Sequence, residues 1–211
     1  MYPVGTYDRF IQKIKGREGK DKPRYLGILF CDIEQSNVKE YIMNYLEVFD
    51  KNSSNHFDFY IPGYLDATED DANYVFEFNN VKYEFNRKVY NEFCNTFSSD
   101  FDIPFPYVAT LVLLEYKSGN FKMAKKCVFN LEQITGGLKD AGRFFDLIFK
   151  SAEKNNELQS ILDDMLNEID EKPEVLFGLI DKVLSFFSLD FKDLRDEFKK
   201  SKNNREQYTL V

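Results

Sequence analysis

The sequence contains no tryptophan, a single histidine, His56, and only three cysteines among its 211 residues. Cys31, Cys94 and Cys127 are far apart and odd in number, a pattern typical of reduced thiols in a cytoplasmic protein and unlike a secreted disulfide scaffold. One histidine and three scattered cysteines also lack the clustered spacing of a zinc site. We therefore expect a cytoplasmic protein with no bound metal and no cofactor.

Long apolar runs and an excess of basic charge are absent as well. No run approaches the roughly 18 apolar residues that a membrane-spanning helix needs, and residues 1–10 lack the apolar centre of a signal peptide. The formal net charge is −8, whereas nucleic-acid binding needs a basic face that displaces counterions. We therefore expect partners other than membranes and nucleic acids.

Aromatic side chains are abundant, with 22 phenylalanines and 13 tyrosines. Apolar residues make up 43% of the sequence, which is enough for a core and argues against a disordered chain. The many Lys, Asn, Phe, Tyr and Ile residues are typical of an AT-rich bacterial gene, so we expect a bacterial source.

The stretch from Tyr25 to Tyr64 predicts the centre of the fold. Residues 25–31 form an apolar run rich in strand formers, as expected of a strand buried on both faces. After a polar break, apolar residues recur at the period of an amphipathic helix, at Val38, Tyr41, Ile42, Tyr45, Leu46 and Phe49. Residues 57–61 follow as a second strand, ended by Pro62-Gly63. Strand, helix and strand at this length predict a right-handed βαβ unit with parallel strands.

Hairpin and helix patterns follow. Two alternating runs flank Asn79-Asn80 and predict a β-hairpin over residues 74–85. A helix, an antiparallel pair of strands and another helix complete this part of the chain, over residues 87–97, 107–116 with 121–131, and 138–152.

The two ends of the chain differ from this middle. A short helix is expected over residues 6–14, within a lead-in over 1–23 that precedes an α/β domain over 24–152. Residues 153–200 have no strand pattern and carry three amphipathic stripes, which predict a helical extension before a polar tail over 201–211. Such stripes need another apolar surface to cover them, either the domain's own sheet or a second copy of the chain.

Without the hairpin at 74–85, this order of elements resembles the thioredoxin fold. The passage Gly27–Tyr41 looks like the strand-to-helix segment that holds the redox motif in that family. Pro106 (or Pro104) matches the family's cis-proline, and the turn at Tyr116–Asn120 looks like its last hairpin. The resemblance covers residues 24–152 and implies a mixed sheet with an inserted hairpin and a C-terminal helical extension.

The chain departs from the family pattern where thioredoxins have Cys-x-x-Cys. The corresponding stretch, Glu34–Lys39, contains no cysteine. A dithiol cycle needs two thiols within bonding reach, the first with a lowered pKa. The family's dithiol oxidoreductase activity is therefore not expected here.

Candidate ligand-binding residues lie at the passage from strand 25–31 to the following helix and at the proline before the last hairpin. They are Cys31, Asp32, Glu34, Ser36, Asn37 and Pro106. The carboxyl ends of parallel strands are the usual ligand side of an α/β sheet, and Asp32 and Glu34 are paired carboxylates at such an end. Ser36 and Lys39 have the S-x-x-K spacing of some acyl-transfer enzymes, although Ser36 or Asn37 as a helix cap accounts for the same residues. We predict no catalytic residue.

The sequence favours a binding or interaction module without redox activity, and leaves enzymatic activity open. Its partner is expected to be another protein, or a second copy associated through the C-terminal helices. The alternative is an enzyme, or a sensor of a small ligand or anion, at the junction of Cys31, Asp32, Glu34 and Ser36. A monothiol oxidoreductase at Cys31 is the least favoured alternative, because this thiol belongs to an apolar strand.

Overall fold

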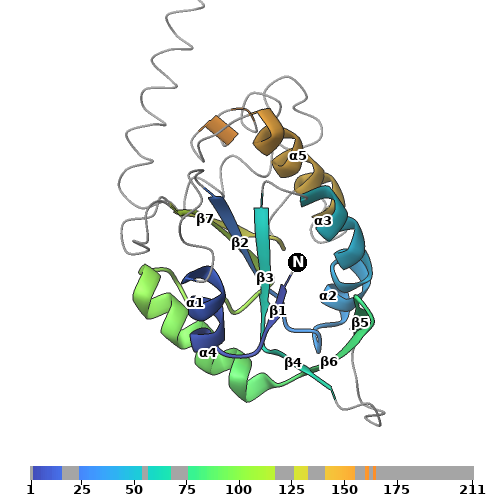
Figure 1. Cartoon of the computed structure of the whole chain (residues 1–211), viewed down its shortest axis with the longest axis vertical. Coiled ribbons are helices and arrows are strands. Elements are labelled where there is room, and N and C mark those ends of the chain that lie inside the picture. Colours follow the sequence, from blue (N-terminus) through green and yellow to red (C-terminus); the bar gives the residue numbers. More distant parts are fainter. Residues whose placement is uncertain are drawn as a thin grey trace, which may run out of the picture.

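A five-stranded mixed sheet lies between two layers of helices (Figure 1). This computed structural model describes residues 2–15, 24–53, 57–67, 76–116, 126–132 and 141–154, together with residues 160, 161 and 164. The strand order is β1-β3-β2-β7-β8, formed by Tyr2–Val4 (β1), Phe57–Pro62 (β3), Arg24–Phe30 (β2), Thr110–Tyr116 (β7) and Lys126–Asn130 (β8). The fold is therefore mixed α/β, as the sequence predicts.

The predicted βαβ unit is present at the centre of this sheet. β2 and β3 are parallel, with Gly27 opposite Phe59, and both strands are largely apolar because helices cover both faces. A Cβ at Gly27 would lie 2.3 Å from Cε1 of Phe59, so only glycine permits this close approach. The ring of Phe59 therefore fills the space that a side chain on β2 would otherwise occupy.

β7 lies on the other side of β2 and is antiparallel to it. The two strands pair along their whole length, from Arg24 opposite Tyr116 to Phe30 opposite Thr110. β8 is in turn antiparallel to β7, which confirms the predicted antiparallel pair. The predicted turn at 117–120 lies outside the described residues.

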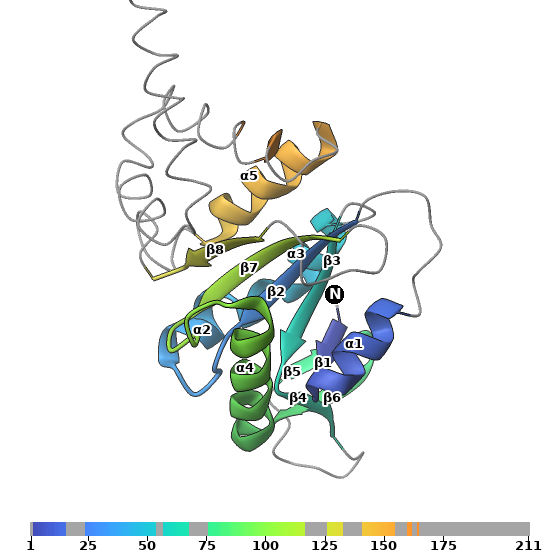
Figure 2. The ribbon, with the colours of Figure 1, turned by 90° about the vertical axis from the view of Figure 1, so that its left-hand side faces the viewer.

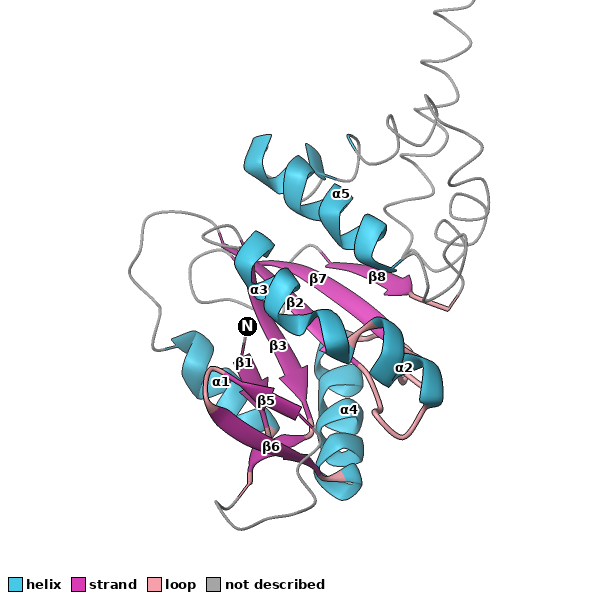
Figure 3. Cartoon of the chain, turned by 90° about the vertical axis from the view of Figure 1, so that its right-hand side faces the viewer, coloured by secondary structure: helices cyan, strands magenta, loops and turns pink. Residues whose placement is uncertain are grey.

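Successive residues from Ile28 to Cys31, at the end of β2, face the two helical layers in alternation. Leu29 and Cys31 point into a core shared with α2 (Ser36–Tyr41), α3 (Leu46–Ser53) and α5 (Ala141–Lys154). Ile28 and Phe30 point into a core shared with α1 (Tyr7–Lys15) and α4 (Arg87–Phe101). Figure 2 views the sheet from the side of α1 and α4, and Figure 3 from the side of α3 and α5.

Residues 2–15, predicted to be a lead-in, belong to the central sheet and its helical cover. β1 is an edge strand parallel to β3. α1 packs against α4, where the Tyr7 hydroxyl donates a hydrogen bond to Oδ2 of Asp100 at 2.7 Å. The helix agrees with the one predicted over residues 6–14, whereas the three residues of β1 contain too little alternation to predict a strand.

The prediction of one continuous helix over residues 38–49 is wrong. The chain instead forms α2, a 3₁₀ turn η1 (Met43–Tyr45) and α3. Ile42, with φ −118°, departs from the φ near −63° of an α-helix. This break turns Met43 into the core and Tyr45 outward, so that Tyr45, predicted to face inward, is 48% exposed.

The predicted hairpin around Asn79-Asn80 is confirmed and forms part of a second, three-stranded sheet. β5 (Phe76–Phe78) and β6 (Val81–Phe85) are antiparallel, and the two asparagines have the positive φ values of a two-residue turn, 52° and 61°. β4 (Tyr64–Asp66) completes the order β4-β6-β5 and continues from β3 through Gly63, whose φ is 85°. The hairpin therefore does not join the main sheet.

α4 is longer than the helix predicted over residues 87–97. Its N-cap residue, Asn86, accepts a hydrogen bond from the Val89 amide at 3.1 Å. At the other end, Nζ of Lys126 on β8 donates to the carbonyl oxygens of Phe101 and Asp102, the latter at 2.9 Å. A lysine that donates to the last carbonyl oxygens of a helix stabilises its C-terminal turn, which is the role of Lys126 here.

Further predictions concern the prolines before β7, the single histidine, the C-terminal residues and membrane spans. The peptide bonds before Pro104 and Pro106 are trans, so the cis-proline that the resemblance implied is not present. His56, most of the extension over 153–200 and the tail over 201–211 lie outside the described residues. None of the described helices is long and apolar enough to cross a membrane.

Candidate functional site

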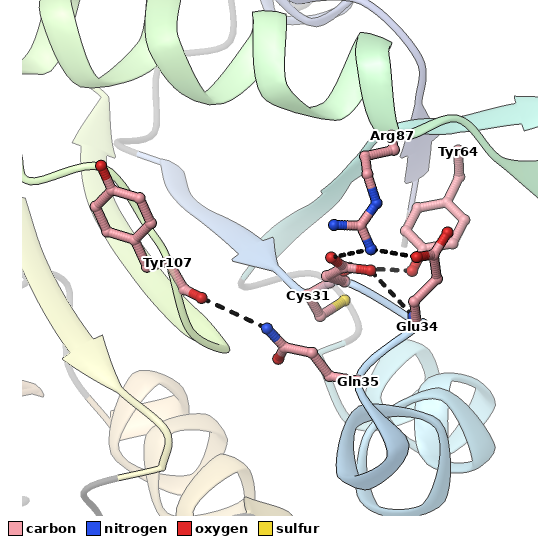
Figure 4. Close-up of polar contacts among 7 residues, drawn as sticks. Cys31, Glu34, Gln35, Tyr64, Arg87 and Tyr107 are labelled. Carbon is pink, nitrogen blue, oxygen red and sulfur yellow. Dashed lines mark hydrogen bonds and ion pairs between the residues drawn. The ribbon is translucent and has the colours of Figure 1, made fainter.

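Three of the predicted candidate residues, Cys31, Asp32 and Glu34, follow one another where β2 ends and α2 begins, and Figure 4 shows this place. After Cys31 the backbone turns, and the Gln35 amide donates to the carbonyl oxygen of Asp32 at 3.0 Å. The side chain of Asp32 supports the same turn, because its Oδ1 accepts a hydrogen bond from the Glu34 amide at 3.0 Å. We refer to residues 31–35 as the β2–α2 junction.

Arg87 joins the β2–α2 junction to the first turn of α4. Its Nη2 contacts Oδ2 of Asp32 at 2.8 Å and also bonds Oε2 of Glu34, as the dashed lines in Figure 4 mark. The hydrogen bond to Glu34, with the charge of Asp32 in support, raises the pKa of the guanidinium. The Asp32 side chain is only 12% exposed and that of Glu34 is 62% exposed, so Asp32 is the better shielded partner.

In the part of the chain that the structure describes, no group of His, Cys, Asp and Glu side chains could hold a metal ion.

Cys31 is fully buried at the base of the β2–α2 junction. Its sulfur lies 3.9 Å from Sδ of Met43, and its carbonyl oxygen accepts a hydrogen bond from the Tyr64 hydroxyl at 3.1 Å. Burial raises the pKa of the Cys31 thiol from 9.0 to about 12. The nucleophilic species of cysteine is the thiolate, so this environment keeps Cys31 in its unreactive form at neutral pH.

Gln35 connects the β2–α2 junction to the loop that precedes β7. Its Nε2 donates to the carbonyl oxygen of Tyr107 at 3.4 Å, which brings the neighbouring Pro106 close to the other candidates. The Pro106 side chain is buried, whereas Tyr107 is 80% exposed, the highest value among the exposed large apolar residues of the described chain. The Tyr107 ring stands 4.6 Å from that of Phe105.

The helix cap predicted at Ser36 or Asn37 is wrong. Gln35 occupies the N-cap position of α2, and its side chain makes no capping hydrogen bond because it extends toward Tyr107. Ser36 begins α2, with its side chain outside the described part, and Asn37 is exposed on the first turn. No described interaction brings Asn37 into contact with the carboxylates of Asp32 and Glu34.

Sequence reasoning missed Arg87, Gln35, Tyr64 and Tyr107. The only signal for Arg87 was its place at the first position of a predicted helix. Local patterns cannot assign residues to one site when they lie 53 to 72 positions apart in sequence. No family model, curated protein or solved structure matches this chain significantly. The chemistry of the junction must therefore be argued from its geometry.

Asp32→Ala is expected to destabilise the protein by about 1–2 kcal/mol, because it removes a hydrogen bond to a backbone amide and a shielded contact to Arg87. The matched variant Glu34→Ala removes a carboxylate that is mostly solvated and should change stability by no more than about 0.5 kcal/mol. Urea unfolding of both variants checks this difference. Equal losses would contradict the structural role given to Asp32.

Proposed function

We propose that this protein is a redox-inactive, thioredoxin-like binding module that recognises a protein partner through the loop 103–109 beside the β2–α2 junction. The observation that carries the proposal is the 80% exposure of Tyr107. Tyrosine is enriched at the energetic centres of protein interfaces, where a rigid ring buries a large area at low entropic cost. An aromatic side chain held this far into solvent is typical of a contact residue.

The arrangement of the sheet supports the thioredoxin-like part of the proposal. β2 and β3 form a parallel βαβ unit, β7 and β8 form an antiparallel pair, and α5 follows the last strand. The β2–α2 junction and the loop 103–109 lie side by side, joined by the hydrogen bond from Gln35 to the Tyr107 carbonyl. The small sheet β4-β6-β5 is then an insertion between β3 and α4.

The state of the thiols supports the redox-inactive part. The three cysteines are free and buried, and burial raises the pKa of each. Cys31 and Cys127 face one core of the sheet, whereas Cys94 faces the other. A disulfide cycle needs an accessible thiolate beside a second thiol, and this arrangement does not favour one.

Gln35 positions the proposed contact loop. Its hydrogen bond to the Tyr107 carbonyl links the loop to the junction, and Tyr107 in turn donates its amide to the carbonyl of Phe105 at 3.0 Å. Both backbone groups of Tyr107 are therefore engaged, which limits the freedom of the backbone that carries the exposed ring. A loop held in this way loses less entropy when it binds.

The test compares the wild-type chain with Tyr107→Ala in quantitative affinity purification from the source organism. The matched control is Val81→Ala, which removes another exposed apolar side chain, at the first residue of β6 in the separate small sheet. We expect a partner that the wild type and Val81→Ala retain equally and that Tyr107→Ala retains at least about tenfold less, as at an interface hot spot. Identical sets of bound proteins for all three chains would refute the proposal.

A small-ligand or anion site at the β2–α2 junction is a less favoured function. Asp32 and Glu34 place two carboxylates at this position, and both already contact the cation of Arg87. An anion would have to approach against these charges and compete with them for the same guanidinium. The geometry therefore favours a structural ion pair here.

A further inference from the structure

The loop before β7, which carries Tyr107, is fixed at both ends by backbone hydrogen bonds. The Ile103 amide donates to a carbonyl oxygen of α4 at 3.1 Å, and the Ala109 carbonyl oxygen accepts from the residue after β8 at 2.8 Å. Between these ends, the bond from Gln35 to the Tyr107 carbonyl is the only hydrogen bond in the described chain that joins residues 104–107 to another element. The position of the Tyr107 backbone therefore depends on one side chain.

The Gln35 side chain makes this link under unfavourable conditions. Its amide group points toward Tyr107 in Figure 4, but Nε2 lies 3.4 Å from the carbonyl oxygen, which is long for such a hydrogen bond. Its other polar atom, Oε1, is buried and accepts no hydrogen bond from the described residues. A buried acceptor without a partner costs at least as much free energy as one neutral hydrogen bond contributes. The linked arrangement is therefore close to energetic balance with an unlinked one.

The backbone of Gln35 does not oppose the unlinked arrangement. Gln35 occupies the N-cap position of α2 with φ −76° and ψ 119°, and its side chain makes no capping hydrogen bond that would hold it elsewhere. The neighbouring residues Glu34 and Asn37 are exposed, so the surface lies close to this position. Rotation of the side chain alone brings Oε1 and Nε2 to water, where both are satisfied, and leaves the Tyr107 carbonyl without this donor.

We propose that Gln35 is a releasable latch on the loop that carries Tyr107. The closed form is the one in the structure, and in the open form the hydrogen bond is broken and the backbone around Tyr107 is free. A partner that binds the closed form then binds with an apparent affinity reduced by the fraction of closed molecules. The latch deepens the proposed function and rests on it for its biological role, but its existence can be tested without a partner.

The test is ¹⁵N NMR relaxation of the Tyr107 and Val108 amides in the full chain. In the wild type, exchange between the two forms should give relaxation dispersion at both amides. Gln35→Glu replaces the donor by a carboxylate that can only accept, so the latch stays open. We expect the dispersion to vanish in this variant and the order parameter of the Tyr107 amide to decrease from about 0.85 to below about 0.6.

Two further variants separate a latch from a structural glutamine. Asn37→Asp adds the same charge as Gln35→Glu on the exposed first turn of α2 and should leave the relaxation of Tyr107 unchanged. Gln35→Met keeps the approximate shape but removes the hydrogen bond and the buried acceptor together. It should free the loop as Gln35→Glu does, while the urea midpoint stays equal to that of the wild type or rises.

Two outcomes would overturn the latch. The first is a Tyr107 amide without dispersion in the wild type and with the same order parameter in both Gln35 variants. The second is a Gln35→Met variant with a lower urea midpoint and an unchanged loop, which would make Gln35 an ordinary packing residue. Relaxation as expected supports the latch even if Tyr107→Ala retains every bound protein, and in that case only the proposed function fails.

Discussion

Gly27→Ala is expected to lower the free energy of unfolding by about 3 kcal/mol, the upper end of the range for an overpacked core. The added Cβ would stand 2.3 Å from Cε1 of Phe59, and the atoms Cδ1 and Cζ of the same ring lie within 2.8 Å. The ring cannot move aside easily, because Phe57, Phe145 and Phe149 surround it with centroid distances between 5.5 and 6.0 Å. Chemical denaturation followed by circular dichroism measures the loss.

The matched control for Gly27→Ala is Gly142→Ala in α5. A Cβ at Gly142 would meet no atom within 4 Å, so the substitution should be neutral or stabilise the protein by up to about 1 kcal/mol through helix propensity. Adding Phe59→Leu to Gly27→Ala should recover part of the loss, because a smaller side chain vacates the space above β2. A Gly27→Ala variant as stable as the wild type would show that β2 and Phe59 do not approach as closely as described.

The second large effect concerns thiol reactivity. At pH 8 a thiol with its ordinary pKa of 9.0 is about one-tenth ionised, whereas Cys31, with its pKa raised to about 12, is ionised in about one molecule in ten thousand. The folded protein should therefore react with a thiol probe at Cys31 at least about a thousandfold more slowly than the urea-unfolded protein. Mass spectrometry of the labelled peptides gives the rate for each cysteine separately.

The same pKa shift predicts how stability depends on pH. The folded thiol of Cys31 retains its proton above pH 9 while the unfolded thiol loses it, so the unfolded state binds fewer protons. The contribution of the Cys31 thiol to stability is therefore fully present below pH 9 and is lost as the pH rises toward 12. Cys31→Ala should reduce the slope of this decrease between pH 8 and 10, measured by urea unfolding.

Fast labelling of Cys31 in the folded protein would refute both the burial of the thiol and the redox-inactive function.

Helices and strands whose residues follow a local periodic pattern could be predicted from the sequence. The apolar run of β2, the alternation around Asn79-Asn80 and the helical periods of α1, α4 and α5 all appear at or near the expected positions. The break at Ile42 could not be predicted, because the period of apolar residues continues through it and only the tertiary position of Met43 distinguishes the two arrangements. β1 was missed for a different reason, since its three residues are a strand only through their pairing with β3.

The candidate site could be predicted only where its residues are neighbours in sequence. Asp32 and Glu34 share one turn, so their proximity follows from the chain itself. Arg87 and Tyr107 reach the same place from distant elements, and nothing in their local sequence indicates this. The burial of Cys31 agrees with its apolar strand, whereas the contact between Gln35 and the Tyr107 carbonyl depends on the path of the loop before β7.

The position of β2 between β3 and β7 also has a consequence for synthesis of the chain. β3 leaves the ribosome soon after β2, but the residues of β7 that pair with β2 follow it by roughly 80 to 90 positions. At about 5–20 residues per second, the second edge of this apolar strand stays unpaired for roughly 4–18 s. During that interval the nascent chain presents an open hydrophobic strand edge, which makes it a ready target for chaperones and for aggregation. Slowing translation between codons 30 and 110 should therefore lower the yield of folded protein more than an equal delay after codon 116.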